Sequence, residues 1–599
     1  MEPTRSDSSV VVDIEKETPS SVNDFNEPSI RTREPRPPGP SPSPTFSAVA
    51  PFASIKRLFD RNPSAVISGR YTVNFRQMLI LIIIFMSITS LWIMGNASST
   101  VIEPEHDQKF MSRPPPGRPA PGINPHIEPP TLNKAEPSID EIEKARERYE
   151  RVRGKGTRSS LKKIQFQFPE ESENDRVERE KRLKAVRDGF EHAWYGYRKH
   201  AWGHDEVRPV DGGYQDRFNG WGATMIDGLD TLVIMGFNRE FDEVLEWIKT
   251  SFDMKKNPTD MHQFFETIIR YLGGLLSAYD LTGEKALLDK AEELGGYMLN
   301  AFQNRDFPAS RVAIKESLNH APVHNFALAE VGSIQLEFSR LSMLTNNPIY
   351  DKKAQRIFEI LGSATSELPG MFPVLVQDGE GRHYSNFKAT VNGMADSFYE
   401  YLLKEWILLD GKPKLFRQMF EKAVDSITKY MVLTPEDGSK DHVVLGIVSS
   451  SSKYVEPEME HLACFMGGSL AMGAKYFDRP DDFELAKKVT QGCYLGYTHS
   501  LTGIAPETMK FEKGRDSNTF ISNSKSYYIR QSGKNAKYIL RPETIESLWI
   551  LYRLTGEKKY QDQAWEIFQS IEANCRTSIA YSGLRDVNSK GSYDDKMER

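Results

Sequence analysis

The fold is decided by a repeat whose first copy, at residues 275–299, reads LLSAYDLTGEKALLDKAEELGGYML. It consists of an apolar helical segment, a short turn at Gly283, and an amphipathic helical segment with apolar residues three and four positions apart. The same pattern returns near the end of the chain, where residues 547–571 read SLWILYRLTGEKKYQDQAWEIFQSI. Further copies occupy residues 337–361 and 402–427 and, more loosely, 470–497.

The spacing of this repeat limits the possible architectures. Its turns fall roughly 65 to 75 residues apart, which is longer than the ~34 to 47 residues of tetratricopeptide or armadillo units. Each interval therefore has room for a pair of helices and a loop. We predict an all-α domain over residues 186–599, built as an α/α barrel whose inner helices surround a central cavity. A superhelical solenoid is the alternative that the spacing leaves open.

Three segments place carboxylates within otherwise apolar helical patterns. They are FFETIIR (264–270), ADSFYEYLL (395–403) and LRPETIESLW (540–549). A buried ionised group is stabilised only by a partner, a metal or hydrogen bonds, so these acids indicate either structural ion pairs or an acid/base site. Each segment has two charged residues three or four positions apart, on one helix face: Glu266 with Arg270, Asp396 with Glu400, and Glu543 with Glu546.

Composition argues against one class of partner. The 599 residues carry a formal net charge of −6. A nucleic-acid-binding protein normally presents a concentrated basic face, and no such face is visible in the sequence. We therefore expect no nucleic-acid partner.

The N-terminal part predicts a single-pass membrane protein. Residues 78–95 form an uncharged apolar run about long enough to span a thin bilayer. Basic residues precede it and acidic residues follow it, so we expect a cytosolic N-terminus and an uncleaved signal anchor rather than a cleaved signal peptide. Residues 1–77 are then a disordered cytosolic tail, and residues 96–185 a luminal stem rich in proline and charge.

The chain contains three cysteines, Cys464, Cys493 and Cys575. A luminal domain permits a disulfide, and we favour Cys464 with Cys493, which would close a short loop. Three buried free thiols are the alternative.

Several motifs resemble the class I α-1,2-mannosidases, glycoside hydrolase family 47. The resemblance runs from about residue 186 to 598 and includes AWGHDEVRP, MIDGLDTLVIMGF, FFETIIRYLGGLLSAYDLTGE, ADSFYEYLLKEW, EMEHLACFMGGSLAMGA, TGIAPE and LRPETIESLWILYRLTGEKKY. It implies an (α/α)7 barrel and a type II membrane protein of the endoplasmic reticulum or Golgi. It also implies an inverting enzyme that trims α-1,2-linked mannose from high-mannose N-glycans with a bound calcium ion.

The resemblance also implies roles for individual residues. Glu266 matches the family's proposed general acid, Glu543 its general base and Asp396 its third essential carboxylate, and the division of labour between Glu266 and Asp396 stays open. Cys464 and Cys493 match a paired cysteine set. Seven further residues match positions that line the sugar pocket: Asp227, Arg270, Glu400, His461, Glu507, Arg541 and Glu546.

Two departures from the family pattern bear on function. Met394 stands where endoplasmic-reticulum members carry arginine and Golgi members leucine, so it resembles the Golgi type. The chain stops at Arg599, where family members continue into another helix and a threonine that binds calcium directly. We therefore expect the last helix to be missing from this chain and name no direct metal ligand.

Three functions follow in order of preference. The first is a mannosyl-oligosaccharide 1,2-α-mannosidase. The second is a glycan-binding quality-control homologue with weak or no hydrolysis. The third, a helical scaffold without sugar chemistry, leaves the three acidic helix faces unexplained.

Overall fold

The computed structural model describes residues 159–256, 261–303, 305–314, 324–516, 518–521 and 536–597. The predicted tail, the anchor at 78–95 and most of the stem lie outside these residues. In the part that is described, no helix is both long and apolar enough to cross a bilayer. All described residues belong to one compact unit.

Sixteen α-helices make up about half of the described chain. They are α4 (Glu173–His200), α5 (Ala223–Asp227), α6 (Leu229–Ile234), α7 (Asn238–Thr250), α8 (Phe264–Glu266), α9 (Gly273–Thr282), α10 (Lys285–Met298), α11 (Leu328–Gly332), α12 (Gln335–Thr345), α13 (Ile349–Ser363), α14 (Asp396–Leu408), α15 (Lys414–Tyr430), α16 (Phe465–Phe477), α17 (Pro480–Thr498), α18 (Glu543–Thr555) and α19 (Lys558–Asn574). A π-helix, η2 (Thr267–Leu272), joins α8 to α9, and a 3-10 helix, η4 (His461–Cys464), precedes α16.

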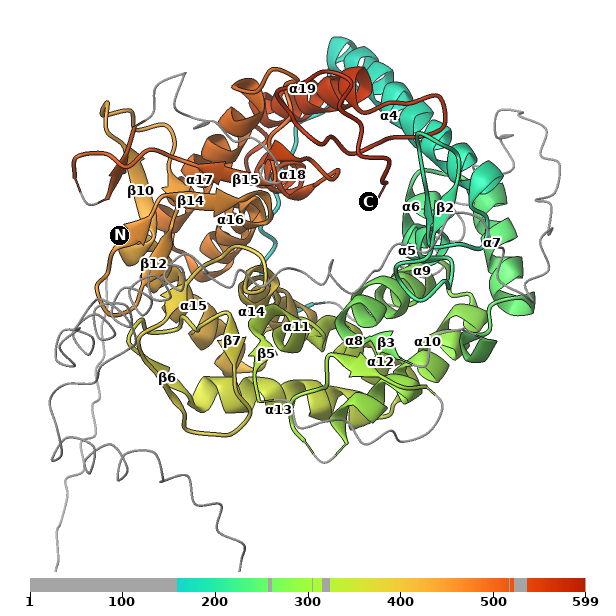
Figure 1. Ribbon diagram of the computed structural model, residues 1–599, viewed down its shortest axis with the longest axis horizontal. Helices are drawn as coiled ribbons and strands as arrows, with labels where there is room; N and C mark the ends of the chain where they lie inside the picture. Colours follow the sequence, from blue (N-terminus) through green and yellow to red (C-terminus); the bar gives the residue numbers. More distant parts are fainter. Residues whose placement is uncertain are drawn as a thin grey trace, which may run out of the picture. The chain divides into compact units, whose positions relative to one another are not determined.

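The helices are arranged in pairs around a ring (Figure 1). Helix α9 packs against α10, α12 against α13, α14 against α15, α16 against α17, and α18 against α19. Neighbouring pairs also contact one another, and α19 packs against α4, the first described helix. This contact between the two ends of the described helices favours a barrel over an open solenoid. Figure 1 shows α9, α14, α16 and α18 on the inner side and α7, α10, α13, α15, α17 and α19 on the outer side.

The predicted turns are confirmed by their backbone conformation. Gly283, Asn346, Asp410, Asp478 and Gly556 each follow the first helix of a pair with a positive φ between 55° and 73°. Glycine, asparagine and aspartate tolerate this left-handed conformation best, which explains why these residue types recur at this point of the repeat.

Short strands occupy the loops between the helices. They form β1 (Glu206–Val207) with β2 (Tyr214–Gln215), β3 (His262–Gln263) with β4 (Arg311–Val312), β5 (Phe326–Ala327) with β7 (Leu375–Val376), β6 (Thr365–Ser366) with β8 (His383–Tyr384), β9 (Lys388–Ala389) with β12 (Ile447–Ser449) and β13 (Val455–Glu456), β10 (Val432–Pro435) with β11 (Val444–Leu445) and β16 (Thr519–Phe520), and β14 (Glu458–Glu460) with β15 (Thr508–Lys510). The antiparallel pair β14–β15 places Glu460 opposite Thr508. These sheets fix loops that the helical repeat alone does not position.

Cys464 and Cys493 form a disulfide with a Cα–Cα separation of 5.9 Å, which joins η4 to α17. The predicted pairing is therefore confirmed, and Cys575 is free and buried. In the chain-entropy model, a crosslink over 29 positions stabilises the folded state by about 3 to 4 kcal/mol.

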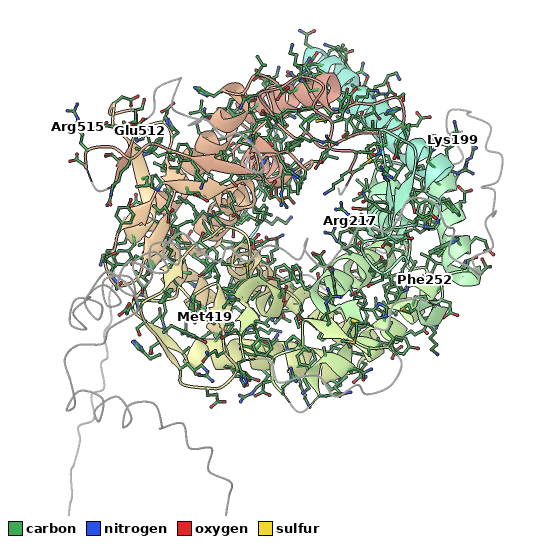
Figure 2. The ribbon with its side chains drawn as sticks, in the orientation of Figure 1. Lys199, Arg217, Phe252, Met419, Glu512 and Arg515 are labelled. Carbon is green, nitrogen blue, oxygen red and sulfur yellow. A yellow bond between two sulfur atoms is a disulfide. The ribbon has the colours of Figure 1, made fainter. Side chains whose placement is uncertain are left out.

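Polar side chains reach both sides of the ring. Arg217 projects toward its centre, whereas Lys199 and Arg515 lie at its outer edge (Figure 2). A charged side chain from the loop before α5 (Ala223–Asp227) therefore reaches the interior of the ring.

Two buried carboxyls between the helices make stability depend on pH. Burial raises the pKa of both Glu337 on α12 and Glu405 on α14 to about 7. Tyr401 donates a hydrogen bond to Glu337, while Ser339 and Gln355 donate to Glu405. Between the unfolded pKa and pH 7 the folded state binds more protons than the unfolded state, so stability decreases as pH rises.

Replacing Glu405 with glutamine tests this coupling. Glutamine keeps a neutral acceptor for Ser339 and Gln355, so Glu405→Gln should lessen the loss of stability between about pH 5 and pH 7. The expected gain near neutral pH is of order 1 to 3 kcal/mol. Urea unfolding at a series of pH values measures it, with Glu359→Gln on the exposed face of α13 as the control. Equal pH dependence in the two variants would contradict the assignment.

Candidate active site

The three predicted catalytic carboxylates lie at the ends of inner-layer helices. Glu266 is the last residue of α8, immediately before the π-helix η2. Asp396 and Glu543 are the first residues of α14 and α18. A carboxylate at a helix N-terminus is stabilised by the helix dipole, and π-helical turns occur often at functional sites. Helices α8, α14 and α18 all face the inside of the ring in Figure 1.

Arg270 links Glu266 to Asp227. Its Nε donates a hydrogen bond of 2.8 Å to Glu266, and its Nη1 lies 3.4 Å from a carboxylate oxygen of Asp227. The guanidinium also lies 4.3 Å from the centre of the Phe218 ring. Although burial lowers the pKa of Arg270, the carboxylates of Glu266 and Asp227 outweigh it and raise that pKa. Arg270 thus keeps its positive charge and orients both acids.

Arg541 organises a second group of acids. Its Nε donates hydrogen bonds of 3.0 and 3.1 Å to the two oxygens of Glu507, and its Nη2 donates to the same carboxylate. Its Nη1 lies 3.9 Å from Glu543. Burial lowers the pKa of Arg541, but Glu507, Glu543 and Asp396 together raise it. The sequence analysis named Arg541, Glu507 and Glu543 as candidate site residues, and the structure places both acids within 4 Å of Arg541.

Asp396 holds a proton near neutral pH more readily than a solvent-exposed aspartate does. Burial raises its pKa to about 7, and the negative charges of Glu400 and Glu460 add to the shift. The Ser397 backbone N–H and the positive charge of Arg541 act in the opposite direction. Asp396 is therefore electrostatically coupled to the Arg541 group, although it lies on a different helix.

Glu400 lies on α14 with Asp396, and Glu546 lies on α18 with Glu543. Glu400, one turn after Asp396, forms a salt bridge with Lys404, whose ammonium lies 4.6 Å from the centre of the Phe465 ring. Burial lowers the pKa of Lys404, but the carboxylates of Glu400 and Glu546 outweigh it. Glu546 is exposed on the same helix as Glu543. The structure thus brings both predicted residues to the charges around Asp396.

His461 differs from the other predicted sugar-binding residues because it is fully buried. Its Nε2 lies 2.9 Å from the Tyr497 hydroxyl and 3.2 Å from the Thr544 hydroxyl. Thr544 follows Glu543, so the contact with Thr544 positions the first turn of α18, and His461 itself is not exposed. A direct contact between His461 and a sugar stays a prediction.

Glu460 is a member of the site that the sequence analysis missed. Its carboxylate accepts a 2.8 Å hydrogen bond from the Gly393 N–H, and its own N–H donates to the Asn392 side chain at 3.1 Å. Burial raises the pKa of Glu460, and Glu507 contributes to the shift. The signal was present, since Glu460 stands beside His461 in the EMEH motif. Its contact with the loop before Asp396 depends on the strand pair β14–β15, which the helical repeat does not predict.

Asp396 and Glu543, which begin α14 and α18, each follow a residue with an unusual backbone conformation. Met394, two positions before Asp396, has φ +68°, and Leu540, three positions before Glu543, has φ +67°. Non-glycine residues seldom adopt this region, and such strain is concentrated at functional sites. Met394 is further held by its carbonyl, which accepts a hydrogen bond from the Ala329 N–H at 2.8 Å.

The described residues do not form a site for the calcium ion that the resemblance implies. In the ranges that the structure describes, no three His, Cys, Asp or Glu side chains are grouped so as to hold a metal ion. The acids around Arg270 and Arg541 are instead neutralised by guanidinium groups. Calcium therefore stays a prediction of the resemblance, and no described residue is assigned as its ligand.

Comparison with known proteins decides the family. Residues 189–599 match the family Glycosyl hydrolase family 47. The chain belongs to this family. A glycosyl hydrolase family 47 relative in Arabidopsis thaliana, the mannosyl-oligosaccharide 1,2-alpha-mannosidase MNS1, is 35% identical over 471 residues, covering 77% of this chain and 78% of the relative.

Two further members of family 47 extend the comparison. The human endoplasmic reticulum mannosyl-oligosaccharide 1,2-alpha-mannosidase is 36% identical over 70% of this chain, which spans 58% of that relative's length. The solved alpha-1,2-mannosidase from Trichoderma reesei superposes with a TM-score of 0.64 at 30% identity, over 70% of this chain and 90% of that one. The helix-rich fold of this chain is therefore that of a family 47 α-1,2-mannosidase.

Arg541 lowers the pKa of Asp396 and Glu400 raises it, so removing each charge in turn should shift this pKa in opposite directions. Arg541→Gln removes a positive charge and should raise the pKa of Asp396 above about 7, whereas Glu400→Gln removes a negative charge and should lower it. Carbon-13 NMR titration of protein labelled at the aspartate carboxyl, with Asp396→Asn to assign the resonance, measures both shifts. Shifts of the same sign would contradict the described electrostatics.

Proposed function

We propose that this protein is an inverting exo-α-1,2-mannosidase that trims mannose from high-mannose N-glycans. The observation that carries the proposal is that a protonatable acid and a charged cluster lie at the starts of two inner helices. Asp396 has a pKa of about 7, while Glu543 lies beside the cationic Arg541. Inversion needs one protonated carboxyl and one carboxylate that activates water from the opposite face of the sugar ring.

The electrostatics favour one division of labour. Asp396 holds a proton near neutral pH and donates it to the departing glycosidic oxygen. Glu543, whose negative charge Arg541 stabilises, accepts a proton from the attacking water. Glu266 accepts a hydrogen bond from Arg270, which suits an acid that positions the substrate or a water molecule. This assignment gives Asp396 the role of general acid, in preference to Glu266.

The other groups orient the sugar. Arg541 contacts both oxygens of Glu507, which keeps this pair rigid, and Arg270 holds Glu266 through one hydrogen bond. Carboxylates held in this way accept hydrogen bonds from sugar hydroxyls, which fixes the reacting ring against the acid and the base. Family members named as 1,2-alpha-mannosidases fit this substrate, and a purely glycan-binding homologue is not favoured.

The proposal extends to architecture and location. The arrangement of the described helices is consistent with an (α/α)7 barrel. The outer helices are α4, α7, α10, α13, α15, α17 and α19, and the inner helices are α6, α9, α12, α14, α16 and α18.

We further propose that residues 78–95 anchor the protein in the endoplasmic reticulum or Golgi membrane with this domain in the lumen. A relative named for the endoplasmic reticulum supports that compartment. No step of the mechanism is assigned to calcium.

Removing the base tests the activity directly. Glu543→Gln should decrease the release of mannose from a Man9-type N-glycan by about 10²- to 10⁴-fold, because glutamine cannot accept the proton from water. Chromatography of the glycan products measures the release, with and without a calcium chelator. Glu359→Gln, on an outer helix, is the matched control. No release by the folded unsubstituted protein would favour the glycan-binding alternative.

The pH profile tests the acid. If Asp396 donates the proton, kcat/KM should fall as pH rises above about 7, since the fraction of protonated Asp396 falls. Glu400→Gln should move this fall to lower pH because it removes a charge that favours the proton. If the fall in kcat/KM occurs at the same pH in the Glu400→Gln protein, a group other than Asp396 causes it.

A further inference from the structure

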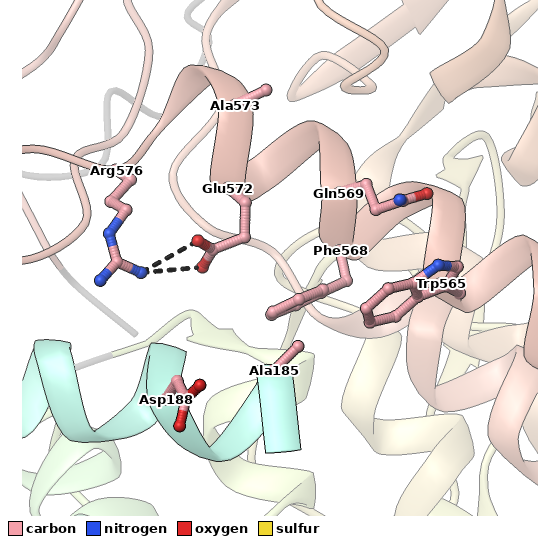
Figure 3. A pocket seen from close by; sticks show the side chains of 8 residues that line it. All are labelled: Ala185, Asp188, Trp565, Phe568, Gln569, Glu572, Ala573 and Arg576. Carbon is pink, nitrogen blue, oxygen red and sulfur yellow. Dashed lines mark hydrogen bonds and ion pairs between the residues drawn. The ribbon is translucent and has the colours of Figure 1, made fainter. Parts of the chain in front are cut away.

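A groove on the outside of the ring is not used by the proposed reaction. It is an open groove between α4 and α19 with a volume of about 530 Å³ (Figure 3). This volume falls within the roughly 300 to 1,000 Å³ of small-ligand sites. The groove is lined by Ala185, Asp188, Trp565, Phe568, Gln569, Glu572, Ala573 and Arg576.

Two stacked aromatic rings form the apolar side of the groove. The rings of Trp565 and Phe568 stack with centroids 5.3 Å apart and planes inclined by 24°. Both are partly exposed. Arg182 lies 5.5 Å from the centre of the Trp565 ring and is itself paired with Glu178 and Asp562, so the tryptophan is held in place. Amphipathic aromatic faces of this kind suit ligands that have both an apolar and a polar side.

The opposite side of the groove is polar but carries paired charges. Arg576 forms a 2.9 Å salt bridge with Glu572, visible in Figure 3, and donates a 2.8 Å hydrogen bond to the Tyr581 hydroxyl. Asp188 is paired with Lys184 at 3.0 Å. Because each charge has an opposite partner, the groove favours a neutral ligand over a phosphate or a cation. The carboxylates keep lone pairs that accept hydrogen bonds from hydroxyl groups.

Close packing fixes the base of the groove. A Cβ at Gly189 would lie 2.8 Å from the Tyr581 hydroxyl oxygen and 3.2 Å from Glu572 Oε1. Helix α4 therefore approaches the polar wall as closely as the backbone allows, and any side chain at this position would displace Tyr581 or Glu572. The polar wall and the aromatic face are thus held in a defined relation to each other.

We propose that this groove is a second, non-catalytic carbohydrate site that binds one pyranose unit of a glycan. The apolar C–H face of the sugar lies on Trp565 and Phe568, and its hydroxyl groups donate to Glu572 and Asp188 and accept from Arg576 and Gln569. The choice of mannose as the sugar rests on the proposed function. The site itself rests on the aromatic face, the paired charges and the volume of the groove.

A second sugar site on the outer surface changes how the protein meets its substrate. On a glycoprotein with several glycans, one glycan held at the groove raises the effective concentration of another at the catalytic centre. This gain is absent for a single small glycan, which cannot occupy both sites at once. The groove should therefore lower KM for glycoproteins and leave turnover of small substrates unchanged.

Fluorine NMR tests binding at the groove itself. The chain has 8 tryptophans, so 5-fluorotryptophan labelling gives a small set of resonances, and Trp565→Phe assigns the one of interest. Titration of the Glu543→Gln protein with methyl α-D-mannopyranoside should shift the Trp565 resonance in a saturable manner. Ala573→Arg, which fills the groove from an exposed position, should abolish the shift, whereas Gln418→Arg on the exposed face of α15 should retain it.

The outcomes separate this proposal from the proposed function. No shift at Trp565 up to the solubility limit of the sugar, or an equal shift in the Ala573→Arg protein, overturns the site. A shift with a peptide or with inorganic phosphate but not with the sugar overturns the ligand class. Mannose release is measured separately on unsubstituted protein, so an inactive protein with a sugar-dependent shift would refute the hydrolase and keep the groove.

Kinetics provide the second measurement. Ala573→Arg should raise KM for a glycoprotein bearing several high-mannose glycans by about tenfold and leave kcat/KM for a free mannobiose unchanged. Gln418→Arg should change neither. A change with both substrates would indicate a disturbed fold, and circular dichroism with thermal unfolding would detect it.

Discussion

The contact between Arg541 and its surrounding acids is the constraint on which the centre of the ring depends. A cluster of carboxylates in one region repels itself, and burial alone would force them all to bind protons. Arg541 pairs with both oxygens of Glu507, lies 3.9 Å from Glu543 and lowers the pKa of Asp396. Its charge therefore allows neighbouring acids to differ in protonation, which is the condition for general acid and base catalysis in one pocket.

Backbone geometry delivers these acids to the same region. Asp396 and Glu543 begin their helices, and each is preceded by a turn with a positive-φ residue, Met394 or Leu540. A helix that starts later would rotate its carboxylate away, because successive positions on a helix differ by about 100°. The strain in these turns is tolerated because the adjoining loops are fixed, for example by the hydrogen bond from Gly393 to Glu460.

The sequence predicted the features that depend on local chemistry. The left-handed turns at Gly283 and Gly556 follow from residue type, and the acidic helix faces follow from helical spacing. Compartment and spacing favoured the pairing of Cys464 with Cys493, and motif resemblance supported it. A feature that depends on distant chain segments was beyond it, since Glu460 meets the loop before Asp396 through a strand pair. The predicted anchor at 78–95 lies outside the described residues and stays a prediction.

The same physics separates structural acids from reactive ones. Glu337, Glu405 and Asp396 all have a pKa raised by burial to about 7, so the shift alone does not identify a catalytic group. Glu337 and Glu405 receive hydrogen bonds from side chains of the helix layers and carry their protons as a cost to stability at neutral pH. Opposing charges act on Asp396, where Glu400 and Glu460 raise the pKa and Arg541 lowers it, and also on Glu337, where Glu405 raises the pKa and Lys404 lowers it. Asp396 differs from Glu337 and Glu405 in its place, since it begins α14 and is influenced by the charge of Arg541, and this position favours it as the catalytic candidate.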